Sequence, residues 1–511
     1  MTSNSNLDRL RASVIEGTTE NVRYRQRELE RLHRSLCKNK SLLLSSISKD
    51  ADGASGKSNF EPDAEFWLTI NAMETHYKSL DFEKSMIEEY LIARGSDNKE
   101  RRVGKGLVII RPTAHTRFYS IITPIAAAIA AGNCVALELA DAMLNVDSVL
   151  KDLLPKALDP ETFCILSTSI GQPSNMFLVD QTTTNSIPSI NQLVSNSSAR
   201  TIAVLDRAAD IDAAAKAIVT ARFSFNGTSP YSPDLVIVND FIKNEFTEAC
   251  SRYAGKLFRK NSVRPQNNDC IKTARALREA EEKGQISMFG SGSFKIVDVL
   301  DRNSSVTQMK ISGYFLPVIE SSSLVDSINI ARPEYVPLRV FYFVFKEPRL
   351  TFPSSDLLAL YTFSDAATAK FLSQHFNALT SYANHIPSHL LVGPAAPVSP
   401  LAPPPRHKYS IEMFSSPRPQ YTSSASAKDD VALVDSILAG FYEPARQQTA
   451  LQKLDATMGG KQGRVLQPKK IQPMGDQLGF FEQGILLGLG SVLAIAISTV
   501  GIGIWAWKRM L

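Results

Sequence analysis

The chain of 511 residues has few cysteines and no recognisable metal-ligand spacing. Its five cysteines show no CxxC pattern, and its seven histidines show no HExxH pattern. Scattered cysteines suit free thiols in a reducing compartment rather than a disulfide framework, and we interpret them as small buried apolar residues. The sequence therefore predicts no metal site. The cysteines are Cys37, Cys134, Cys164, Cys250 and Cys270.

Strong charge of one sign is also absent. The formal net charge is +5 and is spread along the chain, so nothing in it predicts a nucleic-acid partner. The first 17 residues are polar and lack the apolar region of a secretory signal. With 44% hydrophobic and 21% charged residues, the chain is long enough for two or three packed domains.

One long apolar run is present near the end, from Gly484 to Trp507. It contains 24 residues without a charge. A helix of this length covers about 36 Å, more than the roughly 30 Å hydrocarbon core of a bilayer. Trp505 and Trp507 close the run and Lys508 follows, as interfacial aromatics and a basic stop would. We therefore predict a transmembrane helix at 484–507 rather than a buried core helix.

Only four residues follow this run, so insertion must wait until synthesis ends. The sequence thus predicts a single-pass tail anchor in the endoplasmic reticulum or another endomembrane, with the large domain facing the cytosol. A polar connector precedes the run and contains one predicted helix, Asp429 to Phe441, and a basic stretch, Arg464 to Lys470. Those cations either rest on anionic lipid or belong to a solvated linker.

The first half of the chain alternates helical and strand patterns. Gly106 to Pro112 reads as a strand, and Thr123 to Asp141 as a helix, a turn and a second strand. Gly132 and Asn133 are expected to end the helix in a left-handed turn. Such alternation is typical of a doubly wound α/β sheet. Near the N-terminus, helical spacing predicts one apolar face from Leu29, Leu32, Leu36 and Leu42.

The segment from Ala221 to Ala249, ARFSFNGTSPYSPDLVIVNDFIKNEFTEA, resembles the catalytic loop and following strand of aldehyde dehydrogenases, NxGQxCxxPDYVLV. Pro233 and Asp234 fix the register. Five further blocks resemble the family in the expected order. They are TPIAAAIAAGNCVALELAD, DRAADIDAAAKAIVTA, DCIKTARALREAEEKG, KISGYFLPVIE and PRHKYSIEMFSSPRPQ. The resemblance runs from Leu7 to about Gln452 and is closest to class 3, which includes membrane-tethered fatty aldehyde dehydrogenases.

This resemblance implies an α/β fold with two doubly wound, Rossmann-like domains, to which the sequence adds a C-terminal transmembrane helix. The expected parts are a cofactor-binding-like domain at 1–199 and a catalytic-like domain at 200–375. A return segment and oligomerisation region follows at 376–420, then a linker at 421–483 and the transmembrane helix at 484–507.

The same resemblance predicts that the catalytic positions are lost. Pro230 takes the place of the nucleophilic cysteine, and no cysteine occurs between Phe223 and Val238. Aldehyde oxidation through a thioester needs a thiolate, and proline also lacks the backbone N–H of an oxyanion donor. The nearby hydroxyls of Thr228, Ser229 and Ser232 are either replacement nucleophiles or ordinary loop hydrogen-bonding groups, and we favour the second interpretation.

Two further catalytic positions differ from the family. Asn196 replaces the general-base glutamate, and an amide cannot take a proton from water. His115 replaces the asparagine that polarises the carbonyl, although a neutral imidazole still has one N–H to donate.

The cofactor positions are altered as well. Glu138 replaces a lysine that contacts the adenosine ribose, Asp180 and Gln181 replace a glycine and serine near the pyrophosphate, and Lys310 replaces the glutamate that holds the nicotinamide ribose. Carboxylates accept ribose hydroxyls but repel phosphate, which disfavours NADP in particular. The stretch between Gly132 and Arg200 is also about a dozen residues shorter than expected, which predicts a trimmed cofactor helix. We expect no cofactor, or NAD if any.

Two functions remain open at this stage. The first is a membrane-anchored, catalytically impaired aldehyde dehydrogenase-like protein with a scaffolding or regulatory role, bound to membrane lipid through Gly484 to Trp507. The second is an active NAD-dependent dehydrogenase that oxidises long-chain aldehydes to carboxylic acids. Retention of the block KYSIEMFSS predicts a homodimer, or a heterodimer with a homologue.

Overall fold

The computed structural model of the protein forms two units, one of residues 1–94 and 98–420 and one of residues 95–97 and 421–511. The structure describes residues 3–52, 60–139, 144–167, 176–182, 191–258, 268–290, 294–331, 357–397, 408–422, 429–439, 442, 444–457 and 490.

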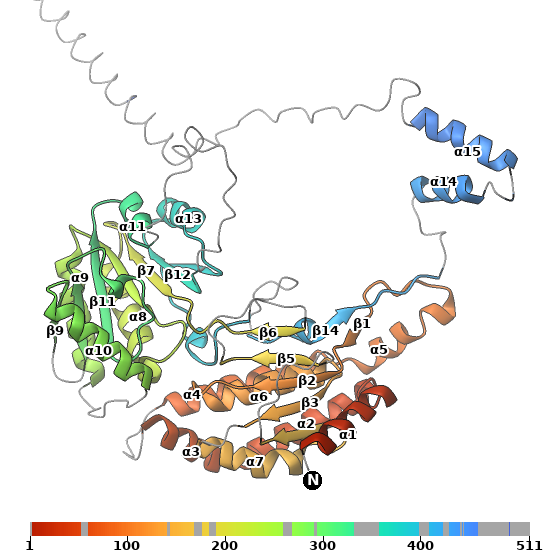
Figure 1. The fold of residues 1–511 in the computed structure, drawn as a ribbon, viewed down its shortest axis with the longest axis horizontal. Helices are drawn as coiled ribbons and strands as arrows, with labels where there is room; N and C mark the ends of the chain where they lie inside the picture. The colour runs from red at the N-terminus through yellow and green to blue at the C-terminus, as the bar shows by residue number, and fades with distance from the viewer. Residues whose placement is uncertain are drawn as a thin grey trace, which may run out of the picture. The chain divides into compact units, whose positions relative to one another are not determined.

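The first unit contains a five-stranded parallel sheet of strand order β4-β3-β2-β5-β6 (Figure 1). Its strands are β2 (Leu107–Arg111), β3 (Cys134–Glu138), β4 (Phe163–Leu166), β5 (Phe177–Asp180) and β6 (Gln192–Val194). The order reverses between β2 and β5, which makes the sheet doubly wound, a topology in which ligands bind at the carboxyl ends of the strands beside the reversal.

Both faces of this sheet are covered by helices, because alternate strand residues point to opposite faces. Val108 and Val135 face one large core, whereas Leu107 and Cys134 face a second core that includes Leu10. The helices of the large core are α2 (Val22–Lys38), α3 (Lys40–Asp52), α4 (Glu61–Lys78), α6 (Arg117–Ala130) and α7 (Asn145–Ala157). Helix α1 (Ser3–Glu16) covers the other face.

The predicted face of leucines near the N-terminus is wrong at one position. Leu29, Leu32 and Leu36 are buried on α2, but Leu42 is 51% exposed. The helix ends at Lys38, with Asn39 as its C-cap, and α3 begins at Lys40. Because this break resets the helical phase, Leu43 faces the core instead of Leu42.

The turn after α6 has the predicted left-handed geometry. Gly132 has a φ of 84°, and an added Cβ would lie 2.7 Å from Nη2 of Arg25. Asn133 then accepts the backbone N–H of Gly106 on its side-chain oxygen at 2.9 Å. Helix α6 and strand β3 are thereby fixed to the start of β2.

The second sheet of the first unit has seven strands in the order β13-β12-β7-β8-β11-β10-β9. All neighbours are parallel except β9 and β10. The strands are β7 (Thr201–Leu205), β8 (Leu235–Asn239), β9 (Ile286–Phe289), β10 (Lys295–Val299), β11 (Phe315–Ser321), β12 (Ala359–Phe363) and β13 (Ser381–Ala383).

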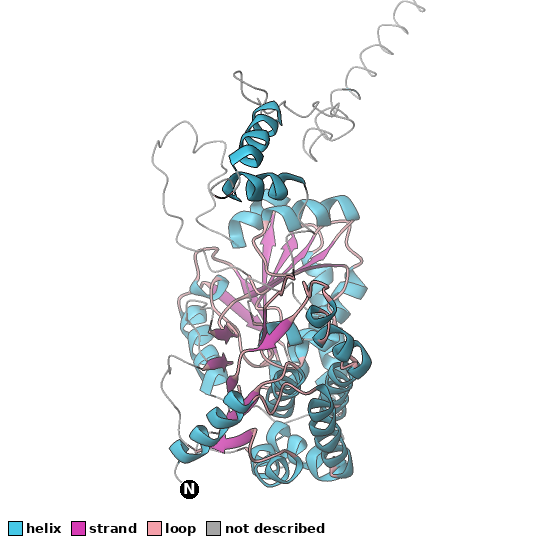
Figure 2. Cartoon of the chain, turned by 90° about the vertical axis from the view of Figure 1, so that its right-hand side faces the viewer, coloured by secondary structure: helices cyan, strands magenta, loops and turns pink. Residues whose placement is uncertain are grey.

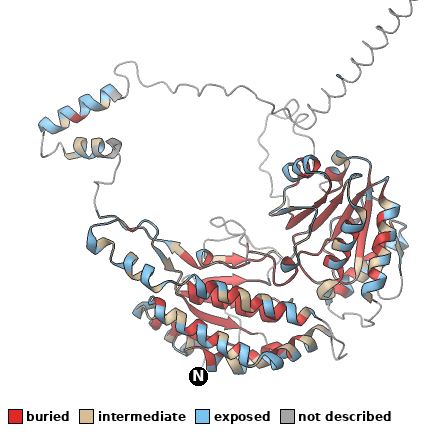
Figure 3. Cartoon of the chain, turned by 180° about the vertical axis from the view of Figure 1, so that it is seen from behind, coloured by how far each residue is buried: buried red, intermediate tan, exposed pale blue. Residues whose placement is uncertain are grey.

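Helices also flank this second sheet, as Figure 2 shows. One face packs on α8 (Ile211–Phe223) and α9 (Lys243–Phe258), and the other on α10 (Asn268–Glu282), α11 (Leu324–Ala331) and α13 (Ala366–His375). The central strands β7 and β8 are buried along their whole length (Figure 3). The prediction of doubly wound α/β sheets is therefore confirmed.

Residues 408–417 return to the first sheet. Strand β14 (Ser415–Pro417) pairs antiparallel with β1 (Arg102–Gly104), and Tyr409 and Phe414 belong to the large core of the first sheet. Lys408, Tyr409, Met413 and Phe414 are all buried in this chain. Internal packing thus accounts for the retained KYSIEMFSS block without a partner, and dimerisation stays a prediction.

The second unit holds two described helices, α14 (Asp429–Leu438) and α15 (Pro444–Thr457). The first matches the helix predicted from Asp429 to Phe441, and the second was not predicted. Within the described part of the chain, no helix has the length and apolar character needed to cross a bilayer. The predicted span at 484–507 lies outside the described residues, except for Gly490.

Candidate functional site

A strained loop between α8 and β8 carries Pro230. After α8, Phe225 and Asn226 adopt positive φ angles of 50° and 58°, which is rare for residues other than glycine. Gly227 follows with a φ of 63°, and an added Cβ there would lie 2.3 Å from the carbonyl oxygen of Gly313. The loop is therefore pressed against the segment that precedes β11, which brings Pro230 close to Lys310.

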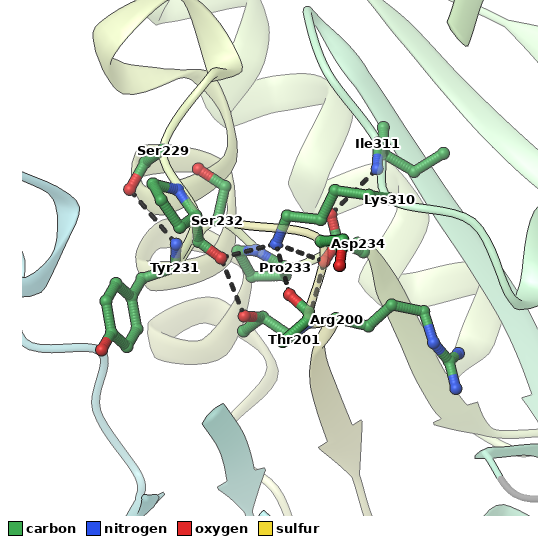
Figure 4. A network of polar contacts seen from close by, with 12 residues as sticks. Arg200, Thr201, Ser229, Tyr231, Ser232, Pro233, Asp234, Lys310 and Ile311 are labelled. Atoms are coloured by element: carbon green, nitrogen blue, oxygen red, sulfur yellow. Dashed lines mark hydrogen bonds and ion pairs between the residues drawn. The ribbon is translucent and has the colours of Figure 1, made fainter. Parts of the chain in front are cut away.

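The ammonium group of Lys310 binds directly to the position of the lost nucleophile. Its Nζ donates to the carbonyl oxygen of Pro230 at 2.6 Å, to Oδ2 of Asp234 at 2.8 Å and to the carbonyl oxygen of Ala199 at 3.1 Å (Figure 4). These three acceptors use all three donors of the ammonium. Burial lowers the pKa of Lys310, and the charge of Asp234 opposes that shift.

Asp234 is the carboxylate that organises this network. It is 1% exposed and accepts the backbone N–H groups of Thr201 at 2.8 Å and Ile311 at 3.0 Å, in addition to Lys310. Nη1 of the fully buried Arg222 lies 3.7 Å from Oδ1 of Asp234. Burial lowers the pKa of Arg222 to about 10, and Asp234 offsets part of that effect. Two cations therefore share one buried carboxylate.

His115 lies beside the same loop. Its Nε2 is 2.9 Å from the carbonyl oxygen of Leu391, and its Nδ1 is 3.0 Å from Oγ1 of Thr228. Because a carbonyl oxygen only accepts, the proton of the neutral ring must be on Nε2. The one N–H that a substrate carbonyl would need is thus already used within the protein.

The contact between Thr228 and His115 gives this hydroxyl a neighbouring imidazole, which the sequence did not reveal. Burial lowers the pKa of His115 to about 4, so the ring is a weak base near neutral pH. The single proton of the Thr228 hydroxyl is shared between Nδ1 of His115 and the carbonyl oxygen of Phe225, which lies 2.8 Å from Oγ1. The Ser232 hydroxyl donates to the carbonyl oxygen of Ala221, and Ser229 accepts the N–H of Tyr231. All three hydroxyls therefore take part in hydrogen bonds of the loop, which agrees with the interpretation of them as ordinary loop groups.

Asn196 forms its hydrogen bonds within its own turn. Its Oδ1 accepts the backbone N–H of Ser198 at 3.1 Å and the hydroxyl of Ser198 at 2.7 Å. The described contacts therefore do not join Asn196 to Pro230 or His115. They do join Pro230 to Lys310, and His115 to Thr228 of the same loop.

Two of the altered cofactor positions, Glu138 and Asp180, meet at the carboxyl edge of the first sheet. Arg111 ends β2, Glu138 ends β3 and Asp180 ends β5, so the parallel register places them side by side. Nε of Arg111 lies 2.7 Å from Oε2 of Glu138, and its Nη1 lies 3.2 Å from Oδ2 of Asp180. Glu138 and Asp180 are 6% and 4% exposed. The sequence did not reveal Arg111 as their shared partner.

Gln181 faces the interior. Its Nε2 donates to the carbonyl oxygen of Ser120 at 2.9 Å and to the hydroxyl of Tyr409 at 2.8 Å, and its Oε1 accepts the N–H of Thr113. These bonds tie β5 to α6 and to the return segment. Residues 183–190, which follow, lie outside the described residues, as does the predicted trimmed helix.

No family model matches the chain. Among curated proteins it is 24% identical over 377 residues to Aldehyde dehydrogenase family 3 member B2 of Mus musculus, covering 67% of this chain and 76% of that protein. It is 22% identical over 368 residues to family 3 member A2 of Mus musculus, covering 66% of this chain and 74% of the relative.

Solved structures agree on the fold. A substrate-bound AldH of Staphylococcus aureus matches with a TM-score of 0.62 at 16% identity, over 84% of this chain and 96% of that one. An NAD-dependent benzaldehyde dehydrogenase from Corynebacterium glutamicum matches with a TM-score of 0.58 at 15% identity, over 82% of this chain and 88% of that one. The chain belongs to the aldehyde dehydrogenase superfamily, class 3.

For a chain of this superfamily, the edge at Arg111 fits a dinucleotide poorly. Two carboxylates and one guanidinium leave a local charge of −1 where a pyrophosphate would need positive charge or free N–H donors. Lys310, which the family alignment places at a ribose position, lies before β11, and its three donors are already used. Among the described residues, no group of three or more histidine, cysteine, aspartate or glutamate side chains is placed to hold a metal ion.

Proposed function

We propose that the protein is a catalytically impaired aldehyde dehydrogenase-like protein that serves as a scaffold or regulator at a membrane. One observation carries this proposal. The Lys310 ammonium, 2.6 Å from the carbonyl oxygen of Pro230, stands beside the position where active relatives need a thiolate. A thiolate is required to add to the aldehyde before hydride transfer, and proline offers none.

The other catalytic positions support the same proposal. Asn196 is bound within its own turn and lacks a basic group, and the single N–H of neutral His115 is donated to Leu391. A chain that had exchanged only its nucleophile would keep a base and an oxyanion donor, and this one keeps neither in working form.

Purified full-length protein in detergent should therefore not oxidise medium or long-chain aldehydes with NAD or NADP. Formation of reduced cofactor above that of heat-inactivated protein, and insensitive to thiol alkylation, would contradict the proposal and reveal a substitute nucleophile. Pro230→Cys alone should not restore turnover, because the base and the oxyanion donor would still be absent.

Calorimetric titration with NAD supplies a separate test of the cofactor site. We expect weak or undetectable binding, because Glu138 and Asp180 present carboxylates and Lys310 is held by internal partners. A dissociation constant in the low micromolar range would contradict this part. The double variant Glu138→Lys and Asp180→Gly, which restores family residues, should bind NAD more tightly than the parent if charge is the obstacle.

The membrane and assembly roles rest on the sequence. We expect the apolar run Gly484 to Trp507 to anchor the protein, and the globular unit to form a homodimer or a heterodimer with a homologue. Deleting residues 484–511 should release the protein from the membrane pellet after alkaline extraction and leave it dimeric in sedimentation experiments. A truncated protein that stays in the pellet, or that sediments as a monomer at micromolar concentration, would contradict this expectation.

A further inference from the structure

The two helices of the second unit form a hairpin that buries very little of its own apolar surface. Helix α14 has 10 residues and α15 has 14, and the two pack side by side (Figure 1). Among the described side chains of these helices, only Ala450 is buried. Helices this short are marginal in water unless an apolar face is packed against another element. The hairpin therefore needs a further surface to cover it.

The exposed apolar side chains of the hairpin lie on one face. Val434 is 48% exposed, Leu438 69% and Leu451 46%. Val434 and Leu438 each directly follow a half-buried residue of α14, and Leu451 directly follows the buried Ala450. In an antiparallel pair of right-handed helices, the residues that follow the line of contact turn to the same side in both helices. The three side chains thus form a single apolar face.

The charges of the hairpin disfavour a membrane surface as the occupant of this face. Helix α14 contains three aspartates and no basic residue, so its formal charge is −3. Helix α15 contains Arg446, Lys453 and Asp455, so its formal charge is +1. Amphipathic helices that lie on anionic lipid carry a basic polar face, and α14 has the opposite charge.

The same charges favour a second copy of the hairpin. A two-fold axis parallel to the helices places α14 of one copy beside α15 of the other and puts like helices on the diagonals. Each acidic helix then has a basic helix as its neighbour across the interface, and all neighbouring helices run antiparallel, as in four-helix bundles. The two apolar faces cover each other in this arrangement.

This symmetry also directs both chains toward one membrane. The apolar run that begins at Gly484 follows α15 along the chain. With the axis parallel to the helices, the C-terminal ends of the two α15 helices point the same way, as two tails in one bilayer require. This part of the argument rests on the proposed function, whereas the apolar face and its charges do not.

We propose that the hairpin of α14 and α15 pairs with the hairpin of a second copy of this chain as a four-helix bundle. Nε2 of Gln447 donates to the carbonyl oxygen of Ile437 at 3.2 Å, which sets the level of the two helices. Val434 and Leu451 both lie about one turn from that bond. Val434 of one copy therefore lies against Leu451 of the other, in a contact outside the first unit.

Disulfide formation in the full-length protein in detergent tests this contact. All proteins carry Cys37→Ser, because Cys37 is exposed and the other four cysteines are buried. Chains with Val434→Cys and chains with Leu451→Cys are co-expressed with different affinity tags, purified and mildly oxidised. We expect the mixed disulfide to form at least about tenfold faster than in the control below, because a bound pair has an effective concentration far above that in solution.

The matched control pairs Val434→Cys with Thr449→Cys. Thr449 is exposed like Leu451, but it precedes Ala450 and so lies on the other side of the hairpin. Equal rates for the two pairs would overturn the proposal. A disulfide that forms faster between two Val434→Cys chains than between Val434→Cys and Leu451→Cys would place like helices together and would also overturn it.

A second pair of variants probes the apolar face without a change of the cysteines. Leu438→Asp puts a charge into the face and should slow the mixed disulfide of Val434→Cys and Leu451→Cys severalfold. Gln448→Asp adds the same charge at an exposed position away from the face and should leave the rate unchanged. An unchanged rate with Leu438→Asp would show that the face is not covered by a second copy.

Vesicles of phosphatidylcholine and phosphatidylserine test lipid as the alternative occupant. Loss of the mixed disulfide on reconstitution would show that lipid covers the face and would overturn the proposal.

Sedimentation and aldehyde oxidation, measured on the same proteins, separate this inference from the proposed function. A slow mixed disulfide in a protein that sediments as a dimer and does not oxidise aldehydes contradicts only the bundle. A fast mixed disulfide in a protein that does oxidise them supports the bundle and contradicts the proposed function.

Discussion

Each of the two sheets of the first unit lies beside a cluster of charged side chains, but the balance of charge differs between the two clusters. At the edge of the first sheet, one guanidinium, Arg111, lies between the carboxylates of Glu138 and Asp180. Beside the loop of the second sheet, Lys310 and Arg222 share the single carboxylate of Asp234.

The two clusters should differ in how much stability is lost when one charged group is removed. The cluster of Asp234 depends on one acceptor that also holds two backbone N–H groups, so that acceptor is the most sensitive group. The cluster of Arg111 is 26% exposed at the cation, so water can take over part of its role. The ion pair of the fully buried Arg222 and Asp234 should therefore matter more to stability than the ion pairs of the partly exposed Arg111 at the sheet edge.

Asp234→Asn should have the largest effect. It leaves Arg222 and Lys310 without a buried counter-charge, and we expect a loss of about 3–5 kcal/mol in the free energy of unfolding. Urea denaturation of the parent and the variant measures it. The matched control is Asp269→Asn, which removes an exposed pair with Lys272 and should cost less than about 1 kcal/mol. Equal effects of the two variants would refute the role given to Asp234.

Arg111→Met should cause the second-largest loss in the free energy of unfolding. It leaves two nearly buried carboxylates side by side, and we expect a loss of about 2–4 kcal/mol, reduced by the partial exposure of the site. Arg275→Met, in an exposed pair with Glu279, is the control and should change the free energy of unfolding by less than about 0.5 kcal/mol. If Arg111→Met proves more damaging than Asp234→Asn, the proposed difference between the two clusters is wrong.

His115 should give a smaller effect that depends on pH. Burial holds its folded-state pKa at about 4, below the ordinary 6.5, so the unfolded chain binds more protons between these values. The stability linked to His115 is therefore present above pH 6.5 and is lost as the pH falls towards 4, by about 2 kcal/mol between pH 7 and pH 4.5.

Comparison of the parent with the variant His115→Gln isolates the pH-dependent stability that is linked to His115. The difference in free energy of unfolding between parent and variant should shift by this amount across the interval, in favour of the variant at low pH. Glu65 also titrates in this range, so it must be present in both proteins. Burial raises the pKa of Glu65 to about 7, and the stability linked to it, present below pH 4.5, is lost as the pH rises. A difference that stays constant with pH would show that His115 is not held neutral.

The architecture could be predicted from the sequence because helix and strand patterns depend on residues that are close together in the chain. Alternation of helix and strand and the order of the family blocks led to the doubly wound sheets, and the left-handed turn at Gly132 followed from local chain geometry. The prediction that Leu42 lies on the buried face failed for a local reason too, since a single break at Asn39 resets the phase of the helix.

The sequence by itself determined that residue 230 has no thiol and that residue 196 has no acid-base group, because side-chain chemistry needs no coordinates. Only the tertiary structure decided which groups meet. Arg111, Glu138 and Asp180 come from three strands brought into parallel register, and Lys310 reaches Pro230 across 80 residues of chain. The tautomer of His115 and the burial of Lys408 likewise depend on distant carbonyls and rings, whose positions follow from packing of the whole unit.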